Sequence, residues 1–523
     1  MTGTLVLLRS FLRRDRWMYV WWPLGVAVLY VSQAWSVDGL YETQADFDKA
    51  AADMAGNTAF IAMAGPARAL NTTGGQVTWQ SAAFGAVLVG LMSMFMIGRH
   101  TRAEEETGRD ELVRAAPIGR YATTVAAVLD AISANLVVGL LTAGTLAAYG
   151  LAGADSLGLG LGVTFCGWFF TGVALLAAQL TTSTRAMYGL TGAVIGIGYG
   201  LRAIGDVGTP ALSWLSPIGW YQAMHAFSGL RWWPGLLLVA GGGLAAVAAY
   251  RVFDRRDFGA GVVPVRPGPA RASRGLLRAW GLGWRLQRPA FVAWLTGLVV
   301  AGAAFGSFGD DVGTLVGDSQ TSQDLFLQGS GDIVDAFYAT MLLMLALIVG
   351  GFTISSALRP QAEEGAGRVE PVLATALPRS TWLAGHVVIT AVGTAVILVA
   401  SGLGLGVTYA LITGDGGAVV RMTAAEASYL PGLLVLGAVA RLLYGVAPRA
   451  APLAWGVLAL AAVVLLFGEL LQLPQWFQDL SPFEHLALMP LEGFAWVPFV
   501  VVTAVAAVLS VAGQIAFSRR DVH

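Results

Sequence analysis

The chain alternates long apolar runs with short polar stretches that hold most of its charges. A helix needs about 20 apolar residues to cross the hydrocarbon core of a bilayer, and twelve runs approach or exceed that length. Seven carry no charge, and each of the other five contains one residue of note, namely Asp130, Cys166, Arg202, His386 or Arg441. The runs are Trp17–Trp35, Val77–Ile97, Tyr121–Ala147, Leu157–Gln179, Met187–Ile204, Trp233–Tyr250, Pro289–Phe308, Ala336–Leu358, Trp382–Ile412, Tyr429–Ala447, Ala451–Phe467 and Phe494–Phe517. The pattern predicts an all-α polytopic membrane protein with about twelve transmembrane helices.

The first residues follow a different pattern. Leucines recur on one helical face and arginines on another, at positions Leu5, Leu8, Leu12, Arg9, Arg13 and Arg16. A helix with separate apolar and basic faces lies in the plane of the membrane surface. We therefore predict an interfacial amphipathic helix at residues 1–16, and a second one near residues 274–285, where leucine, tryptophan and arginine recur in a similar order.

The two parts of the chain repeat one another. At an offset of 259, EETGRDELVRAAPIGR (105–120) aligns with EGAGRVEPVLATALPR (364–379). Near an offset of 265, a Leu-Ser-Pro sequence and an Arg-Arg-Asp sequence each recur. Such repetition indicates two tandem structural units. The expected parts are the interfacial helix at 1–16, a first six-span half at 17–253, a linker with the second amphipathic helix at 254–288, and a second six-span half at 289–523.

Arginine placement predicts the orientation, because short cytoplasmic segments are enriched in basic residues. Residues 251–288 contain nine arginines and two aspartates, whereas residues 309–335 contain six aspartates and no basic residue. The first stretch is therefore expected in the cytoplasm and the second outside. With twelve spans, both termini and the charged stretches 100–120 and 359–379 are also cytoplasmic.

Composition narrows the functional classes. The 523 residues are 56% hydrophobic and 12% charged, with a mean hydropathy of +0.67, which excludes a soluble enzyme. A net charge of −1 argues against a nucleic-acid partner. Cys166 is the single cysteine, and the five histidines lack zinc-ligand spacing. Lys49, the single lysine, follows Asp48, so the phosphate-binding Gly-Lys-Ser/Thr signature is absent from the sequence.

The repeated charged stretches are the candidate functional site. Glu105 and Arg109 are four residues apart, as are Glu364 and Arg368, so a continuous helix would pair them at about 0.2–0.5 kcal/mol each. If the charged stretch occurred once, a solvated charged helix without a specific function would explain it. Two copies at matching places favour surfaces that dock a paired cytoplasmic partner.

These stretches resemble the segment between the second and third spans of ABC-2-type permeases, typically Glu-x-Glu-x-Gly-Thr-x-Glu-x-Leu-Leu followed by Pro and Arg. With the duplication and the Ser-Pro segments before the last span of each half, the whole chain resembles the actinobacterial exporters of polyketide antibiotics of the tetronasin type. In that family the segment is a coupling helix that rests in a groove of the ATP-binding subunit. The positions assigned to coupling are Glu105, Glu106, Gly108, Arg109, Glu111, Pro117, Arg120, Glu363, Glu364, Gly367, Arg368, Glu370, Pro378 and Arg379.

The chain departs from the family pattern at several positions. Arg109 and Arg368 replace the usual threonine, Pro371 stands where the first half has Leu112, and Gly365 replaces a glutamate. The two segments are therefore expected to contact the partner unequally.

The resemblance implies a permease subunit without enzyme activity or a cofactor of its own. It would export hydrophobic or amphipathic compounds, such as antibiotics and other drugs, across the cytoplasmic (inner) membrane. ATP and Mg²⁺ would be bound by a separate ATPase subunit, expected in two copies because the chain has two coupling segments. No metal site and no catalytic residue are expected in this chain.

Two other classes compete with this interpretation. A proton-coupled antiporter of the major facilitator type also has six plus six spans, but its Gly-x-x-x-Asp-Arg-x-Gly-Arg loop is absent from the sequence. A CAAX-type intramembrane protease uses Glu-Glu-x-x-x-Arg, which 104–109 and 363–368 match. That family also has a phenylalanine four residues before a histidine, and no histidine of this chain has one.

Charged residues inside membrane spans are rare and usually face a cavity or a partner. Asp130, Arg202 and Arg441 are therefore candidates for the substrate pathway. Equally, the two arginines can reach the span ends, and a neutral Asp130 can bond a neighbouring helix. Cys166 is expected to be an inert buried thiol.

Overall fold

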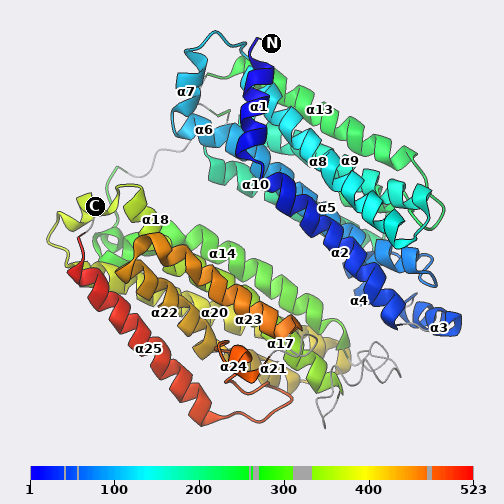
Figure 1. The fold of residues 1–523 in the computed structure, drawn as a ribbon. Coiled ribbons are helices and arrows are strands. Elements are labelled where there is room, and N and C mark those ends of the chain that lie inside the picture. The colour runs from blue at the N-terminus through cyan, green and yellow to red at the C-terminus, as the bar shows by residue number, and fades with distance from the viewer. Residues whose placement is uncertain are drawn as a thin grey trace. The chain divides into compact units, whose positions relative to one another are not determined.

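The computed structural model describes residues 2–40, 43–55, 58–257, 259, 261–262, 270–309, 333–467 and 474–521. Every regular element within these ranges is a helix. The chain divides into two compact units, residues 1–267 and 268–523 (Figure 1). Residues 263–269 of the predicted linker at 254–288 lie outside the described residues, and so do five of the six aspartates expected in the external segment 309–335.

The described part of the first unit contains six long helices, a surface helix and several short ones. Its elements are α1 (Thr4–Arg14), α2 (Met18–Leu40), α3 (Gln44–Ala55), α4 (Thr58–Ala64), α5 (Thr73–His100), α6 (Arg102–Glu106), α7 (Arg109–Arg114), α8 (Ala122–Tyr149), α9 (Gly153–Leu180), α10 (Thr184–Val207), α11 (Pro210–Ser213), α12 (Pro217–Gln222) and α13 (Trp233–Arg255). The helix α9 packs against α5, α8 and α13, and α2 packs against α5 and α8. The amphipathic helix expected at residues 1–16 is present as α1, which lies against α8.

The second unit repeats this order. Its described elements are η1 (Arg274–Leu277), α14 (Ala279–Gly306), α17 (Ile333–Ala357), α18 (Arg359–Gly365), α19 (Val369–Leu373), α20 (Arg379–Thr413), α21 (Ala418–Ala427), α22 (Leu430–Val446), η3 (Pro448–Leu453), α23 (Ala454–Phe467), α24 (Gln475–Gln478) and α25 (Trp496–Arg519). The main packing pairs are α14 with α20 and α22 with α25. The second amphipathic stretch forms η1 and the start of α14.

Ten described helical stretches are long and apolar enough to cross a membrane, and they overlap ten of the twelve expected runs. The other two runs form α2 and α10, of 23 and 24 residues. The result is consistent with a polytopic membrane protein. The count of twelve spans and the cytoplasmic position of the termini stay predictions.

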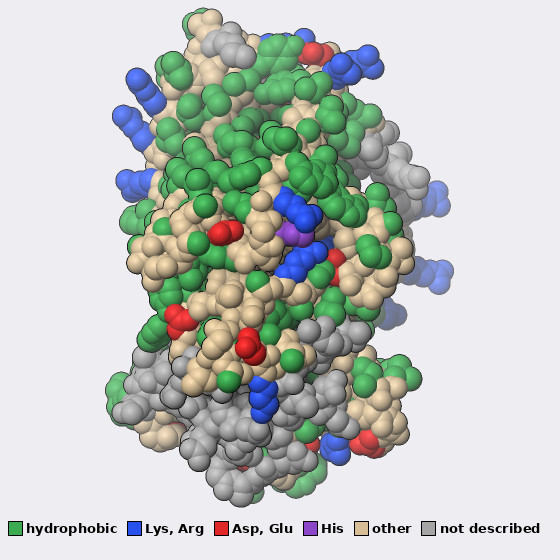
Figure 2. Space-filling view, turned by 90° about the vertical axis from the view of Figure 1, so that its right-hand side faces the viewer, with side chains coloured by type: hydrophobic (Ala, Val, Ile, Leu, Met, Phe, Trp, Pro, Cys, Tyr) green, Lys and Arg blue, Asp and Glu red, His purple; other side chains and the backbone are tan. Residues whose placement is uncertain are grey.

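Apolar side chains cover the outside of the long helices. Val497 and Val508 of α25 are 75% and 67% exposed, and hydrophobic side chains occupy much of the face drawn in Figure 2. A water-soluble protein rarely exposes a continuous apolar surface of this extent. These faces are suited to contact with lipid.

Small residues let the helices approach one another closely. A methyl group added to Gly139 of α8 would overlap the Thr164 hydroxyl and the backbone carbonyl oxygen of Gly160, both in α9. In the second unit, a methyl group on Gly302 of α14 would overlap the carbonyl oxygen of Ser401 in α20. Glycine is required at such contacts because membrane helices gain their association energy from close packing.

Candidate functional site

Each charged stretch forms two short helices with a break between them. The break follows α6 at Gly108, which has φ +70°, and follows α18 at Gly367, which has φ +67°. Glycine adopts this left-handed conformation without the steric cost that other residues meet. The glycine that aligns in the two repeats is therefore the residue that turns the chain between the short helices.

The break makes the predicted i,i+4 ion pairs wrong. Glu105 does not pair with Arg109 but with Arg102 and Arg256, at nitrogen–oxygen distances of 2.7 and 2.6 Å. Arg368 pairs with Glu363, at 2.8 Å between Nε and Oε2, and not with Glu364. The prediction assumed one continuous helix, whereas Gly108 and Gly367 reverse the backbone before the arginine.

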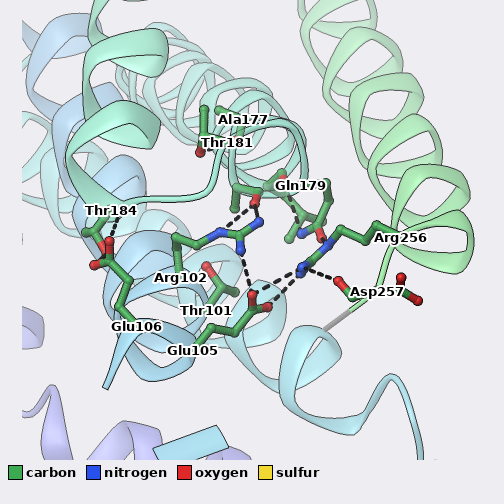
Figure 3. Close-up of polar contacts among 12 residues, drawn as sticks. Thr101, Arg102, Glu105, Glu106, Ala177, Gln179, Thr181, Thr184, Arg256 and Asp257 are labelled. Atoms are coloured by element: carbon green, nitrogen blue, oxygen red, sulfur yellow. Dashed lines mark hydrogen bonds and ion pairs between the residues drawn. The ribbon is translucent and has the colours of Figure 1, made fainter. Parts of the chain in front are cut away.

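An equivalent ion pair closes the charged segment of each unit. Arg256, after α13, contacts Glu105, and Arg520, after α25, contacts Glu364 at 2.5 Å (Figure 3 shows the first). We call the Glu105–Arg256 and Glu364–Arg520 pairs the two clasps. Burial alone would lower the pKa of Arg520, but its hydrogen bonds and charge contact with Glu364 raise it above the ordinary value. All four clasp residues lie in repeated sequences. The repeat alone, however, does not show which of these residues pair.

A second contact also recurs in both units. The Arg120 guanidinium donates to the backbone carbonyl oxygens of Phe253 and Asp254, and Arg379 donates to that of Arg520. Cations are favoured at helix C-termini, where carbonyl groups lack partners. Both arginines thus hold the end of the last helix of their unit beside the charged segment.

Glu104 and Glu106 of the first segment contact helices outside it. Glu106 accepts hydrogen bonds from the backbone N–H and the hydroxyl of Thr184, at 3.0 and 2.6 Å, at the start of α10 (Figure 3). Arg102, 1% exposed, donates to the backbone carbonyl oxygen of Ala178 near the end of α9. Glu104 pairs with Arg14 of α1 at 2.5 Å. The segment is therefore attached to α1, α9, α10 and α13.

The second segment has a different set of contacts around its clasp. Glu363 is 6% exposed and lies between Arg359 and Arg368. Tyr444 of α22 donates a hydrogen bond of 2.6 Å to Glu364. A cavity of about 320 Å³ opens beside this segment, lined chiefly by apolar side chains of α14, α19 and α20 with Glu363 and Arg368. The two segments therefore differ in their surroundings, although their backbones follow the same plan.

The predicted coupling positions fall into two sets. The buried or half-buried positions are Glu105, Gly108, Glu363 and Glu364. The positions exposed to solvent, which we call the outward set, are Glu106, Arg109, Glu111, Pro117, Arg120, Gly367, Arg368, Glu370, Pro378 and Arg379. Two further residues of the first segment differ in the same way: Leu112 is 77% exposed and Asp110 is 5% exposed. The outward set, together with Leu112, forms an exposed surface that is partly apolar.

The three charged residues inside the spans bond to neighbouring elements. Arg202 is fully buried, donates to the backbone carbonyl oxygen of Met63 at 2.8 Å and lies over the Tyr199 ring. Arg441 of α22 donates to the Ser510 hydroxyl of α25. Both arginines are therefore bonded to neighbouring elements. A pathway role, and the alternative in which they reach the span ends, both stay predictions.

Asp130 belongs to a group that the sequence did not reveal. Its carboxylate lies close to His100, at 3.6 Å, and His100 contacts Asp15. The three residues come from distant parts of the first unit, so spacing along the chain gives no sign of their contact.

Comparisons with known proteins show the family to which the chain belongs. Residues 276–518 match the family model described as "Multidrug efflux system permease Rv1217c, C-terminal domain". The whole chain is 37% identical, over 530 residues, to the multidrug efflux system permease protein Rv1217c of Mycobacterium tuberculosis, covering 100% of this chain and 96% of that protein. The chain belongs to this family of multidrug efflux permeases. As a member of the permease family with ten long apolar helices among its described residues, it is a multi-pass membrane protein.

Proposed function

We propose that this protein is the membrane-spanning subunit of an ATP-driven exporter that moves hydrophobic or amphipathic compounds, such as antibiotics, out across the cytoplasmic membrane. Membership of the multidrug efflux permease family supports the export of drugs. The observation that carries the ATP-driven mechanism is the pair of clasps, because the same contact recurs at the same place in both units.

The clasps suit the transfer of force. Each joins a protruding segment to the last helix of its unit, and Glu106 adds a contact to α10. A partner that pushes on the outward residues of the segment would move these helices as well. Breaking a buried ion pair costs several kcal/mol, so the connection resists such a load.

We assign ATP and Mg²⁺ to a separate ATPase, in two copies, one for each segment. The outward set, with Leu112 and Glu111 in the first unit and Glu370 in the second, would rest on its surface. In this proposal both termini and both segments face the cytoplasm, where ATP is available.

Reconstitution tests the proposal. The chain is purified together with a candidate ATP-binding-cassette protein, to be sought in the reading frame beside its gene, and placed in proteoliposomes. We expect ATP-dependent, vanadate-sensitive transport of a fluorescent amphipathic dye, which is lost in the double variant Arg109→Ala/Arg368→Ala and in Glu111→Ala/Glu370→Ala. Arg421→Ala is the matched control, because this exposed arginine lies far along the sequence from both segments and pairs only at the surface.

Two results would overturn the proposal. One is dye accumulation by the chain alone, driven by a proton gradient without ATP, which would indicate the antiporter. The other is full ATP-driven transport by both double variants.

A further inference from the structure

Three ionisable side chains meet inside the first unit, away from the clasps. Asp15 lies between α1 and α2, His100 ends α5, and Asp130 belongs to α8, and all three are fully buried. His100 Nε2 is 2.6 Å from Asp15 Oδ2 and 3.6 Å from Asp130 Oδ2. Phe11 of α1 stacks on the His100 ring, with 4.0 Å between centroids.

Neighbouring groups provide hydrogen-bond or ion-pair partners for only some of the polar atoms in this cluster. Arg99 of α5 contacts Asp15 Oδ1 at 2.7 Å. Tyr19 of α2 donates to Asp130, with 2.7 Å to the backbone oxygen and 3.1 Å to Oδ1, and its hydroxyl also contacts Ser133 of α8. Among the described residues, Asp130 Oδ2 and His100 Nδ1 have no hydrogen-bond partner. A buried carboxylate oxygen therefore faces the imidazole without a donor.

The charges of the cluster do not balance without an added cation. Two ionised carboxylates, a neutral imidazole and the Arg99 guanidinium leave one negative charge in a buried place. Burial opposes the ionisation of Asp15, but its hydrogen bond with His100 and the charges of His100 and Arg99 hold its pKa below the ordinary value. Asp15 is thus an ionised member, and one proton bound within the cluster makes it neutral.

The distances favour a proton over a metal ion. Two ligand atoms on one tetrahedral zinc ion, each about 2.1 Å away, would be about 3.4 Å apart. His100 Nε2 and Asp15 Oδ2 are 2.6 Å apart, which is a hydrogen-bond distance. A metal-bound histidine also donates its second nitrogen to a partner, whereas His100 Nδ1 has none among the described residues.

We propose that Asp15, His100 and Asp130 form a buried binding site for one exchangeable proton. While the proton is bound, the site holds α1 against the end of α5, where the first charged segment begins. We call this contact the latch. His100 is followed after one residue by α6, and Asp15 follows α1. Loss of the proton leaves two ionised carboxylates close together, with Arg99 as their counter-ion. The repulsion loosens α1 and the end of α5.

Spectroscopy of the full chain in lipid nanodiscs tests for the proton, independently of transport. Infrared spectra follow the carboxylic-acid band and nitrogen-15 spectra follow His100 from about pH 5 to about pH 9. We expect one group to lose its proton in this range and Asp130→Asn to abolish that change. Glu426→Gln is the matched control, because it removes a fully buried carboxyl group of the second unit.

Thiol labelling tests for the latch. In a Cys166→Ser background, Leu8→Cys places a thiol on the packed face of α1, and Leu5→Cys places one where the side chain is 70% exposed. The ratio of the two labelling rates cancels the ionisation of the thiol itself. On deprotonation we expect the ratio to rise on the order of tenfold, as for the loss of one hydrogen bond to a charged group. Asp130→Asn should remove this pH dependence.

Several outcomes would overturn the proposal. They are the absence of any titrating group in the cluster, a titration unchanged by Asp130→Asn, or a labelling ratio that does not vary with pH. Stoichiometric zinc in the purified chain that is lost in Asp15→Asn would also do so, and would assign the cluster to a metal.

Discussion

Arg256 and Glu105 form an ion pair of 2.6 Å that joins the end of α13 to α6, with 4% and 9% of their side chains exposed. The corresponding residues of the second unit, Arg520 and Glu364, form the same pair. Because the two contacts arise from repeated sequences and enclose the same kind of segment, they are the structural basis for the proposed transmission of force.

Removal of a clasp arginine should weaken the unit. In Arg256→Ala, Glu105 keeps Arg102 but loses its contact with the end of α13, and we expect a loss of about 3 kcal/mol in the free energy of unfolding. Thermal unfolding in detergent measures the change. Arg421→Ala breaks an exposed pair and should cost less than about 1 kcal/mol. Equal losses in the two variants would contradict a special role for the clasp.

The turn glycines should tolerate alanine poorly for a conformational reason. Nothing lies within 4 Å of a methyl group added to Gly108, yet its φ of +70° disfavours any side chain. We expect Gly108→Ala to cost about 1 kcal/mol and to reduce drug-stimulated ATP hydrolysis by the assembled exporter. Gly189→Ala, at an open helical position, is the control and should leave both unchanged or slightly improved. An unaffected Gly108→Ala variant would show that the break is not needed.

The close contact of α8 with α9 should be sensitive to a single methyl group. Gly139→Ala forces the helices apart, and we expect it to destabilise the protein by about 1–3 kcal/mol. Gly144→Ala, on the same helix with open space around it, should be neutral or stabilising. Circular dichroism during thermal unfolding compares them, and an equal effect of the two substitutions would count against glycine-mediated packing.

The exposed Leu112 should contribute to partner binding and not to the fold. We expect Leu112→Ser to weaken binding of the ATPase roughly tenfold, as for the loss of one apolar contact residue, with an unchanged melting temperature. Leu411→Ser is the control, because this leucine is 80% exposed at the other end of α20 from the second segment. Binding measured by surface plasmon resonance that is equal in wild type and Leu112→Ser would remove Leu112 from the interface.

Acid should weaken the loop around His225. Burial and the charges of Arg68 and Arg231 lower the pKa of His225 from 6.5 to about 4. The unfolded chain therefore binds this proton more tightly than the folded one, so stability falls as pH drops from about 6.5 to about 4 and is constant on either side. His225→Gln should flatten the melting temperature over that window. A variant with the wild-type pH profile would assign the effect to another group.

The long helices could be predicted from the sequence because lipid demands uninterrupted apolar runs, which remain visible without knowledge of packing. The run at 17–35 became α2, although Pro23 lies within it, because a proline one or two turns into a membrane helix is tolerated. The repeat also located both charged segments. These features depend on residues close together in the chain.

Contacts between distant residues could not be predicted in the same way. Glu105 and Arg109 suggested an ion pair by spacing alone, but the turn at Gly108 separates them and Arg256 takes the place of Arg109. Asp130 appeared isolated because its neighbours Asp15, between α1 and α2, and His100, in α5, are distant from it along the chain. Only the folded arrangement shows which charges are compensated.

Both members of each clasp belong to the same unit. A duplication of an ancestral six-helix protein would therefore copy the contact complete, with no need for compensating changes in the other copy. After such a duplication, the residues around each clasp could change independently. Two differences between the units are the cavity beside the second segment and the Arg14–Glu104 pair beside the first. Each unit thus retains its own clasp, while the surroundings of the two charged segments differ.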